Sequence, residues 1–151
     1  MEASPIDLVV GEQQGNQVSL RPLYRENPSA QDYDDGNWLV TESLLEAGAF
    51  GGKVRASLCT QDFFSFRTQL RGLTTTPRGA ARFETMEEWL ELEVVGDGKG
   101  HFAGTGELTD SPGTGNRLRF SFAFDQTHLP AMLRQLEEIC RRFPVIGEPA
   151  V

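Results

Sequence analysis

The clearest alternation of hydrophobic and polar residues lies in the segment 118–127. Every second side chain from Leu118 to Phe124 is large and apolar, and the side chains between them are small or polar. This period of two predicts a β-strand with one face in a hydrophobic core. A different period follows at once, because apolar residues from Leu129 to Phe143 recur every three or four positions. That spacing predicts an amphipathic helix, and Pro144 ends it.

The rest of the chain shows the same two kinds of pattern. A second run at helical spacing comprises Phe63, Phe66, Leu70 and Leu73. With Thr60 as N-cap and Gly72 as a C-terminal stop, it predicts a helix over Gln61–Arg71. Seven shorter apolar runs, bounded by turn residues, predict strands at Ile6–Val10, Asn16–Tyr24, Trp38–Glu46, Gly52–Cys59, Ala81–Thr85, Trp89–Val95 and Gly100–Leu108. The polar segment 25–37 is expected to be a loop.

Together these elements predict one α+β domain over residues 1–151. A chain of this length buries roughly 70% of its unfolded surface, so it needs no disulfide or metal to hold a core. We expect a curved antiparallel sheet of about seven or eight strands with two helices packed on one side. Residues 1–35 are expected to form peripheral strands and an acidic loop, and residues 144–151 a loose tail. The order strands, helix, strands, helix repeats once, but the residues of the two parts do not match.

The charge of the chain narrows the class of partner. The sequence has 14 Lys and Arg against 22 Asp and Glu, a net charge of −8. Such a surface repels phosphate backbones and anionic membranes and favours basic proteins. The N-terminus shows no signal peptide, and no apolar run is long enough to span a bilayer, so a cytoplasmic location is expected. The sparse cysteines, Cys59 and Cys140, are expected to be free and buried, with a disulfide as the alternative.

The most distinctive polar feature is an acidic stretch from Glu84 to Asp97 that contains no Lys or Arg. On a strand, Trp89, Glu91 and Glu93 share one face, opposite three apolar residues. An indole and two carboxylates would then project together and form a docking patch for a basic partner. Two alternatives are a solvated sheet face with Trp89 packed against a neighbour, and an acid/base pair formed by Glu91 and Glu93.

Other candidate sites have weaker patterns. Asp32, Asp34 and Asp35 precede Gly36, but Gly36 stands where a calcium loop needs an oxygen ligand, so we expect a capped turn. The two histidines, His101 and His128, lack zinc-ligand spacing with the cysteines. His128 near Asp125 could pair as an acid and a base, or be only a polar residue beside a helix start. No phosphate-binding loop or nucleophile motif is present. We therefore expect no catalytic residues, metal or cofactor.

Several short motifs occur together in the sequence: Gly36-Asn37-Trp38-Leu39-Val40, Thr60-Gln61-Asp62-Phe63, Met86-Glu87-Glu88-Trp89-Leu90-Glu91-Leu92, Gly98-Lys99-Gly100-His101, Asn116-Arg117-Leu118-Arg119-Phe120 and Phe124-Asp125-Gln126-Thr127 before Leu129-Pro130. Over residues 36–144 this pattern resembles the WapI-type family of small bacterial immunity proteins. The resemblance implies a cytosolic antidote to the toxin end of a contact-dependent inhibition protein. It brings no catalytic residues.

The leading hypothesis is therefore a non-enzymatic immunity protein that binds and blocks a cationic toxin domain, which could be a nuclease. The residues expected to bind this partner are Glu87, Trp89, Glu91, Glu93, Asp34 and Asp35. One alternative is a small-molecule-binding or enzymatic module with a pocket between sheet and helices. Another is a homodimer that pairs through an exposed sheet face or edge.

Overall fold

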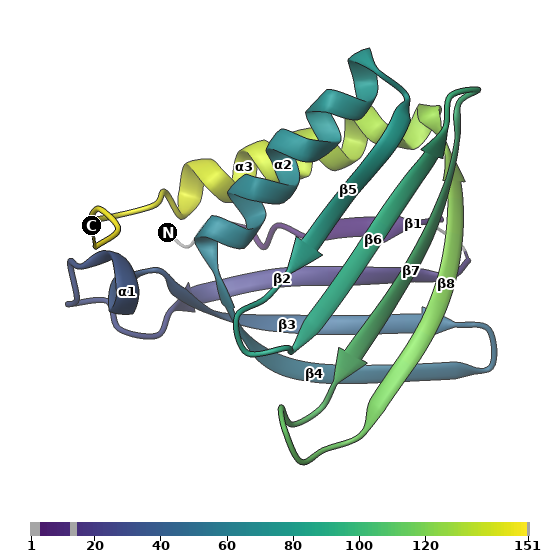
Figure 1. Cartoon of the computed structure of the whole chain (residues 1–151). Coiled ribbons are helices and arrows are strands. Elements are labelled where there is room, and N and C mark those ends of the chain that lie inside the picture. Colours follow the sequence, from purple (N-terminus) through teal and green to yellow (C-terminus); the bar gives the residue numbers. More distant parts are fainter. Residues whose placement is uncertain (1–3, 13–14, 151) are drawn as a thin grey trace.

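The computed structural model describes residues 4–12 and 15–150, and it contains two antiparallel sheets of four strands each (Figure 1). Sheet A consists of β1 (Leu8–Gly11), β2 (Gln17–Arg25), β3 (Trp38–Ala47) and β4 (Phe50–Cys59). Sheet B consists of β5 (Arg78–Glu84), β6 (Leu90–Asp97), β7 (His101–Thr109) and β8 (Arg117–Asp125). The helices are α1 (Tyr33–Gly36), α2 (Thr60–Thr75) and α3 (Leu129–Arg142), the last preceded by the 3₁₀ turn η1 (Gln126–His128).

The α+β class and the strands are confirmed, but the prediction of one curved sheet is wrong. The two sheets lie one behind the other with crossing strands, and α2 and α3 run along one side of the pair (Figure 1). Helix α2 lies against β5, and α3 lies against β1. The physical reason is the connection: α2 follows β4 directly and carries the chain to a second layer, so β5 does not pair with β4. Each sheet then buries its apolar face against the other sheet and the helices.

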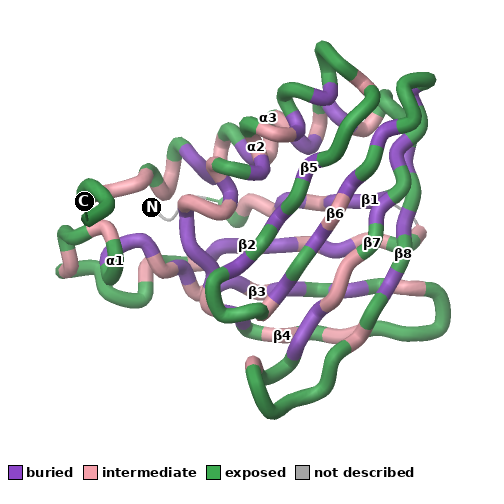
Figure 2. The backbone as a smooth tube through the Cα atoms, in the orientation of Figure 1, coloured by how far each residue is buried: buried purple, intermediate pink, exposed green. Residues whose placement is uncertain are grey.

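One hydrophobic core lies between the sheets and beneath the helices (Figure 2). In sheet B it contains Phe120, Phe122 and Phe124, as the period-two pattern predicts. Strand β7 makes room for two of these rings with glycines. Gly104 pairs with Phe122 and Gly106 pairs with Phe120, and a Cβ atom on Gly104 would lie 2.1 Å from the Phe122 ring. The aromatic rings thus lie over the bare backbone of β7, which fixes the register of β7 and β8.

Three local predictions differ from the structure. The N-cap of α2 is Cys59, and Thr60 is the first residue of the helix. Gly72 does not end α2, which continues to Thr75, because Leu73 is buried in the core and the Thr76 N–H still bonds to the Gly72 carbonyl. The segment 25–37 is not wholly a loop, since it contains the single turn α1. The carboxylate of Asp32 accepts a hydrogen bond from the Asp35 N–H and caps that turn.

Side chains of the helices cover two sheet edges. Gln69 of α2 accepts a hydrogen bond from the Arg82 N–H of β5 at 2.8 Å and donates one to the Arg82 carbonyl at 3.2 Å. Gln135 of α3 accepts one from the Val9 N–H of β1 at 2.9 Å. Both edges thereby have backbone groups satisfied by side chains, which hinders pairing with another strand.

The segment after α3, expected to be a loose tail, makes specific hydrogen bonds in its first part. Buried Asn37 donates a hydrogen bond to the Ile146 carbonyl and accepts one from the Ile146 N–H, both at 2.9 Å. Arg25 donates to the Pro144 carbonyl at 2.5 Å. These contacts hold residues 144–146 against the end of sheet A beside α1.

Candidate functional site

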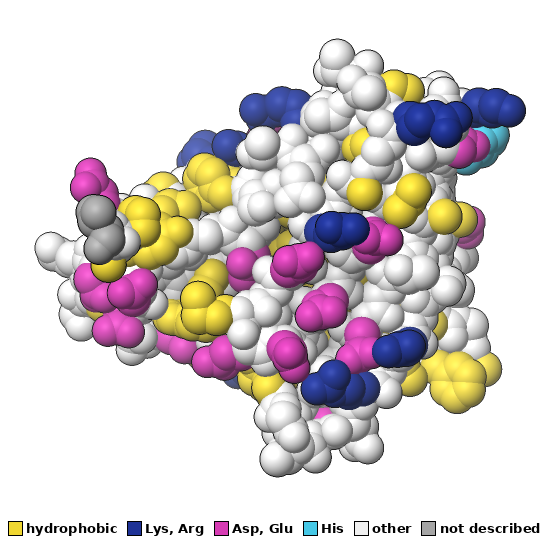
Figure 3. Space-filling model, viewed as in Figure 1, with side chains coloured by type: hydrophobic (Ala, Val, Ile, Leu, Met, Phe, Trp, Pro, Cys, Tyr) yellow, Lys and Arg dark blue, Asp and Glu magenta, His cyan; other side chains and the backbone are white. Residues whose placement is uncertain are grey.

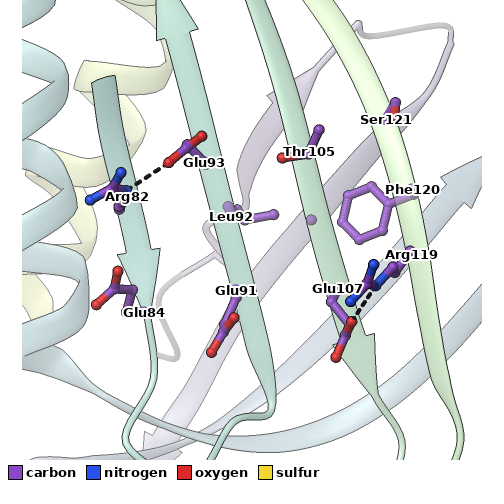
Figure 4. Close-up of a pocket in the computed structure, with 11 residues that line it drawn as sticks. Arg82, Glu84, Glu91, Leu92, Glu93, Thr105, Glu107, Arg119, Phe120 and Ser121 are labelled. Carbon is purple, nitrogen blue, oxygen red and sulfur yellow. Dashed lines mark hydrogen bonds and ion pairs between the residues drawn. The ribbon is translucent and has the colours of Figure 1, made fainter. Parts of the chain in front are cut away.

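The outer face of sheet B carries a row of three glutamates on adjacent strands. In the strand register Glu84 of β5 lies opposite Glu91 of β6, and Glu91 lies opposite Glu107 of β7. The alternation that buries Leu90 and Leu92 turns these carboxylates outward. Directly opposite side chains on neighbouring strands are about 5 Å apart at Cβ, and like charges there destabilise a sheet. We call Glu84, Glu91 and Glu107 the glutamate row; Figure 4 shows them on three adjacent strands.

Arginines neutralise only part of this face. Arg119 donates a hydrogen bond to Glu107 at 2.9 Å, and Arg117 donates another at 3.1 Å. The hydrogen bond from Arg119, followed by that from Arg117, holds the pKa of Glu107 below its ordinary value. Within the described residues, Glu84 and Glu91 take part in no ion pair. Two adjacent carboxylates of the row are therefore free to meet a cation from outside the chain.

Glu93 lies one position above the row and is paired within the chain. Arg82 of β5 donates a hydrogen bond to Glu93 at 2.7 Å, and this hydrogen bond raises the pKa of Arg82 (Figure 4). The side chain of Arg82 is 58% exposed, so the pair contributes little to stability. The sequence placed Glu93 on the correct face, but Arg82 already satisfies it, which leaves Glu91 as the more available of the two carboxylates.

The glutamate row lies in a shallow, open hollow of about 710 Å³ on the surface of sheet B. A smaller hollow of about 360 Å³ adjoins it between α2 and β5, and the two share Arg82 and Glu84. The smaller hollow contains Asp62 from the first turn of α2. Burial raises the pKa of Asp62 to about 6, although the hydrogen bond from the Cys59 N–H acts in the opposite direction. Asp62 therefore extends the acidic surface toward α2 at neutral pH.

The turn between β5 and β6 borders the row and contains two more of the expected site residues, Glu87 and Trp89. Trp89 precedes β6, is half-buried and packs against the core, and its indole nitrogen has no hydrogen-bond partner among the described residues. Glu88 has a positive φ of 62° and lies 3.3 Å from Arg117. Met86 is 79% exposed, which makes it the most exposed apolar side chain of this turn. Glu87 is exposed beside it.

Asp34 and Asp35 lie elsewhere in the molecule. They belong to α1, at the end of sheet A where the C-terminal segment also lies (Figure 1). The carbonyl groups of these two residues contact nearby side chains: the Asp34 carbonyl accepts from the Trp38 indole at 2.8 Å, and the Asp35 carbonyl accepts from Asn27 at 3.2 Å. Figure 3 shows acidic side chains both at this end and across the face of sheet B, with basic side chains among and above those of sheet B. The expected partner-binding residues thus divide between two separate acidic regions.

Sequence reasoning missed three residues of this surface: Glu84, Glu107 and Met86. Glu84 belongs to the acidic stretch, and its position in an alternating run indicates that it points outward. Glu107 also alternates with buried Leu108. Their alignment with Glu91 has no signal along the chain, because it depends on how β5, β6 and β7 pair.

The two histidines border a third open hollow of about 520 Å³ at the other end of sheet B. His101 Nδ1 lies 3.1 Å from Asp97, and His128 Nδ1 lies 3.4 Å from Asp125. The hydroxyl and the backbone N–H of Thr127 also bond to Asp125 and hold its pKa below the ordinary value. In residues 4–12 and 15–150, no three His, Cys, Asp or Glu side chains are grouped so as to hold a metal ion.

Both cysteines are free and buried, and burial raises the pKa of Cys59 to about 12. That value keeps the thiol protonated at neutral pH, so Cys59 is a poor nucleophile. None of the helices in the described part of the chain has the length and apolar character needed to cross a membrane.

Comparison with protein-family models gives a match over residues 9–144 with a family described as immunity protein WapI-like. The match covers most of the chain and confirms the resemblance seen in the sequence. It includes every strand except the first residue of β1, both long helices and the whole glutamate row. A comparison with curated proteins finds no match.

Proposed function

Because the chain belongs to the WapI-like immunity protein family, we propose that it binds a toxin domain and blocks it with the outer face of sheet B. The proposed partner is a cationic protein domain, met in the cytoplasm. The observation that carries the proposal is the glutamate row, in which Glu84 and Glu91 face each other without an internal cation. Family membership supports the immunity role, and the charge of this face supports the choice of surface.

The energetics of the row favour a partner of opposite charge. Like charges placed opposite each other on neighbouring strands cost about 0.2–1 kcal/mol per pair. A lysine or arginine from a partner would turn this repulsion into attraction at Glu84 and Glu91. The same carboxylates would speed the encounter, because complementary charge raises association rates and makes them sensitive to salt. Met86, at the border of the row, would supply an apolar anchor that excludes water from the contact.

Binding in this way would also explain how the toxin is blocked. A toxin that cleaves nucleic acid needs a cationic surface to hold the phosphate backbone. An acidic sheet face laid on that surface competes directly with the substrate. A nuclease is therefore the class of toxin that this surface fits best. The same charge argues against a nucleic acid or an anionic membrane as the ligand of this face.

The alternative of a ligand pocket between the sheets and helices has less support. The space where α2 meets β5 is filled by aromatic side chains, with the Phe63 and Phe83 rings 5.2 Å apart and the Phe66 and Phe83 rings 5.7 Å apart. The hollows described above lie on the surface and are open. Shallow, charged hollows of this kind suit contact with another protein better than the binding of a small molecule.

The experiment begins with capture of the toxin domain by the tagged protein from the lysate of its native cell at low salt. The captured domain, identified by mass spectrometry and purified, is then used for affinity measurements. The variant Glu84→Lys/Glu91→Lys should lower its affinity roughly a hundredfold, about 3 kcal/mol. The matched control Glu137→Lys/Glu148→Lys changes the net charge equally, on α3 and the C-terminal segment, and should have little effect.

A cell assay separates the surface from the function. Cells that express the toxin should survive with the wild-type protein or the control variant, and should die with Glu84→Lys/Glu91→Lys. If both variants protect and bind equally, sheet B is the wrong surface although the immunity role stands. If the wild-type protein neither binds nor protects, the immunity role itself fails for this chain.

A further inference from the structure

Strand β4 is an open sheet edge in a molecule that covers its other edges. The helices cover β5 with Gln69 and β1 with Gln135, and Asn16 donates a hydrogen bond to the Ser121 carbonyl of β8 at 2.9 Å. Strand β4 is the last strand of sheet A. In the described residues, no group outside β3 hydrogen-bonds to its backbone between Phe50 and Leu58. A strand of this length with free N–H and C=O groups is a template for another strand.

The composition of this edge suits the close approach of another backbone. Gly52 has neither a positive φ nor a crowded environment, since a Cβ atom there would meet nothing nearer than Leu108 at 4.0 Å. Glycine at an unstrained, uncrowded strand position weakens the strand and often marks a place where a second backbone comes near. Gly51 precedes it, and Phe50 is 69% exposed. The strand β4 thus offers an exposed aromatic ring followed by bare backbone.

We propose that β4 pairs antiparallel with β4 of a second copy, about a two-fold axis at Gly52, and joins two A sheets into one. In this register Phe50 lies opposite Val54 of the second copy, and Lys53 lies opposite its Gly51. Because the axis repeats each of these two contacts, both pairs occur twice. Registers centred on Lys53 or Val54 would instead place Lys53 opposite a Lys or an Arg, which is destabilising.

The charges along the edge complement themselves in the register centred on Gly52. Within one chain Glu46 of β3 lies beside Gly51, and both residues are exposed. Across the axis, Lys53 would extend over Gly51 of the second copy toward the Glu46 behind it. Strands are about 4.8 Å apart, so the two backbones would be about 10 Å apart, within reach of a lysine and a glutamate together. The missing side chain at Gly51 leaves the path for this ion pair open.

The contact leaves the glutamate row free, since it involves the edge of sheet A and not the outer face of sheet B. A single added strand pair buries less surface than a standard interface. The dimer should therefore be reversible, with a dissociation constant on the order of 10 µM. It should also weaken as salt is added, because its ion pairs are exposed.

Sedimentation velocity of the full chain over a range of micromolar concentrations tests the proposal. The wild-type protein should pass from monomer to dimer, Lys53→Glu should weaken the dimer roughly tenfold, and Glu46→Lys/Lys53→Glu should restore it. Circular dichroism and thermal melts check that each variant is folded. A protein that stays monomeric throughout would refute the proposal.

Cysteine cross-linking tests the register itself. Residues directly opposite in an antiparallel pair have Cα atoms about 4.5–5.5 Å apart, which permits a disulfide. Gly52→Cys should therefore form a covalent dimer under mild oxidation. The control Ser57→Cys should not, since its counterpart would lie about 30 Å away along the strands. If Lys53→Glu leaves the dimer affinity unchanged and Gly52→Cys does not cross-link, the dimer contact lies on another surface and the inference is wrong.

Discussion

The first half of the chain, from β1 to α2, and the second half, from β5 to α3, have the same order of elements. Each half is a meander of four antiparallel strands followed by a helix, with α1 as an addition in the first half. Each helix lies against the first strand of the other half, α2 on β5 and α3 on β1. The two halves therefore complete each other, and neither covers its own sheet edge.

The two sheets have the same strand arrangement, but their outer faces differ in the order of their charged side chains. On sheet A the register sets Arg21 opposite Glu42 and Glu42 opposite Arg55, so charges alternate in sign. On sheet B the corresponding row contains three glutamates. The first arrangement stabilises the sheet, and the second costs stability. The two sheets thus have the same architecture, but the charges on the outer face of sheet A stabilise the fold and those on sheet B destabilise it. A destabilising row of this kind is expected of a binding surface.

The largest difference between the halves should be in how much the substitution of a strand glycine destabilises the fold. Gly104→Ala should destabilise the fold by about 2–3 kcal/mol, because its Cβ would lie 2.1 Å from the Phe122 ring and the ring would have to move. Gly52→Ala in sheet A is the control and should change stability by less than about 0.5 kcal/mol. Urea unfolding measures both. Equal effects would mean that the ring does not fix the packing over β7.

The carboxylates near the starts of the two long helices should contribute to stability with opposite pH dependence. Burial raises the pKa of Asp62 to about 6, above its ordinary value, so the folded state keeps a proton that the unfolded state loses first. The contribution of Asp62 to stability is therefore fully present below about pH 4 and is lost as the pH rises to about 6. Asp62→Asn should remove this loss and gain about 2 kcal/mol at neutral pH. Urea unfolding as a function of pH measures it.

Asp125 is the N-cap of η1, just before α3, and the pH dependence of its contribution to stability should have the opposite sign. The hydrogen bond from the Thr127 hydroxyl, followed by that from the Thr127 N–H, holds the pKa of Asp125 below its ordinary value. Its contribution is present at neutral pH and is lost as the pH falls below about 4. In Asp125→Asn that acid loss should become smaller. If both variants shift the pH profile in the same direction, the two helix starts are not different in the way described.

The covers of the two sheet edges should have smaller and unequal effects. Gln69→Ala removes two hydrogen bonds to Arg82 of β5 and should cost about 1 kcal/mol. Gln135→Ala removes one to Val9 of β1 and should cost about half as much. Hydrogen exchange should show faster exchange of the Arg82 amide in the first variant and of the Val9 amide in the second. Unchanged exchange at both amides would show that the helices protect the edges by packing alone.

The smallest expected effect is a change in stability that has opposite signs for glutamate substitutions on the two outer faces. Glu91→Gln should raise the stability of the isolated chain by about 0.2–1 kcal/mol, because it interrupts the glutamate row. Glu42→Gln should lower it by a similar amount, because Glu42 lies between two arginines and 3.1 Å from Arg55. Added salt should reduce both differences. Urea unfolding at low and high salt gives the values, and a loss of stability in Glu91→Gln would contradict the strain assigned to the row.

The direction of the strand carboxylates on the acidic face could be predicted from single segments. The arrangement of the turn that borders this face could not. Alternation around Leu90 and Leu92 correctly turns Glu91 and Glu93 outward. The same alternation placed Trp89 on the outer face, with an indole packed against a neighbour as the alternative. In the structure β6 begins only at Leu90, and the residue before Trp89 has a positive φ. The turn thus leaves the indole half-buried against the core. Met86, which no periodic pattern marks, is the exposed apolar residue of this turn.

The sequence by itself determined the local elements and which side of each strand is apolar. Alternation of side chains along a strand and recurrence on one side of a helix depend only on backbone geometry, so the strand at β8 and the helix at α3 follow from residue order. Only the tertiary structure decided that the strands form two facing sheets, that Glu84, Glu91 and Glu107 align, and that β4 keeps an open edge. These features depend on which strands pair and in what register, which is set by packing between residues far apart in the chain.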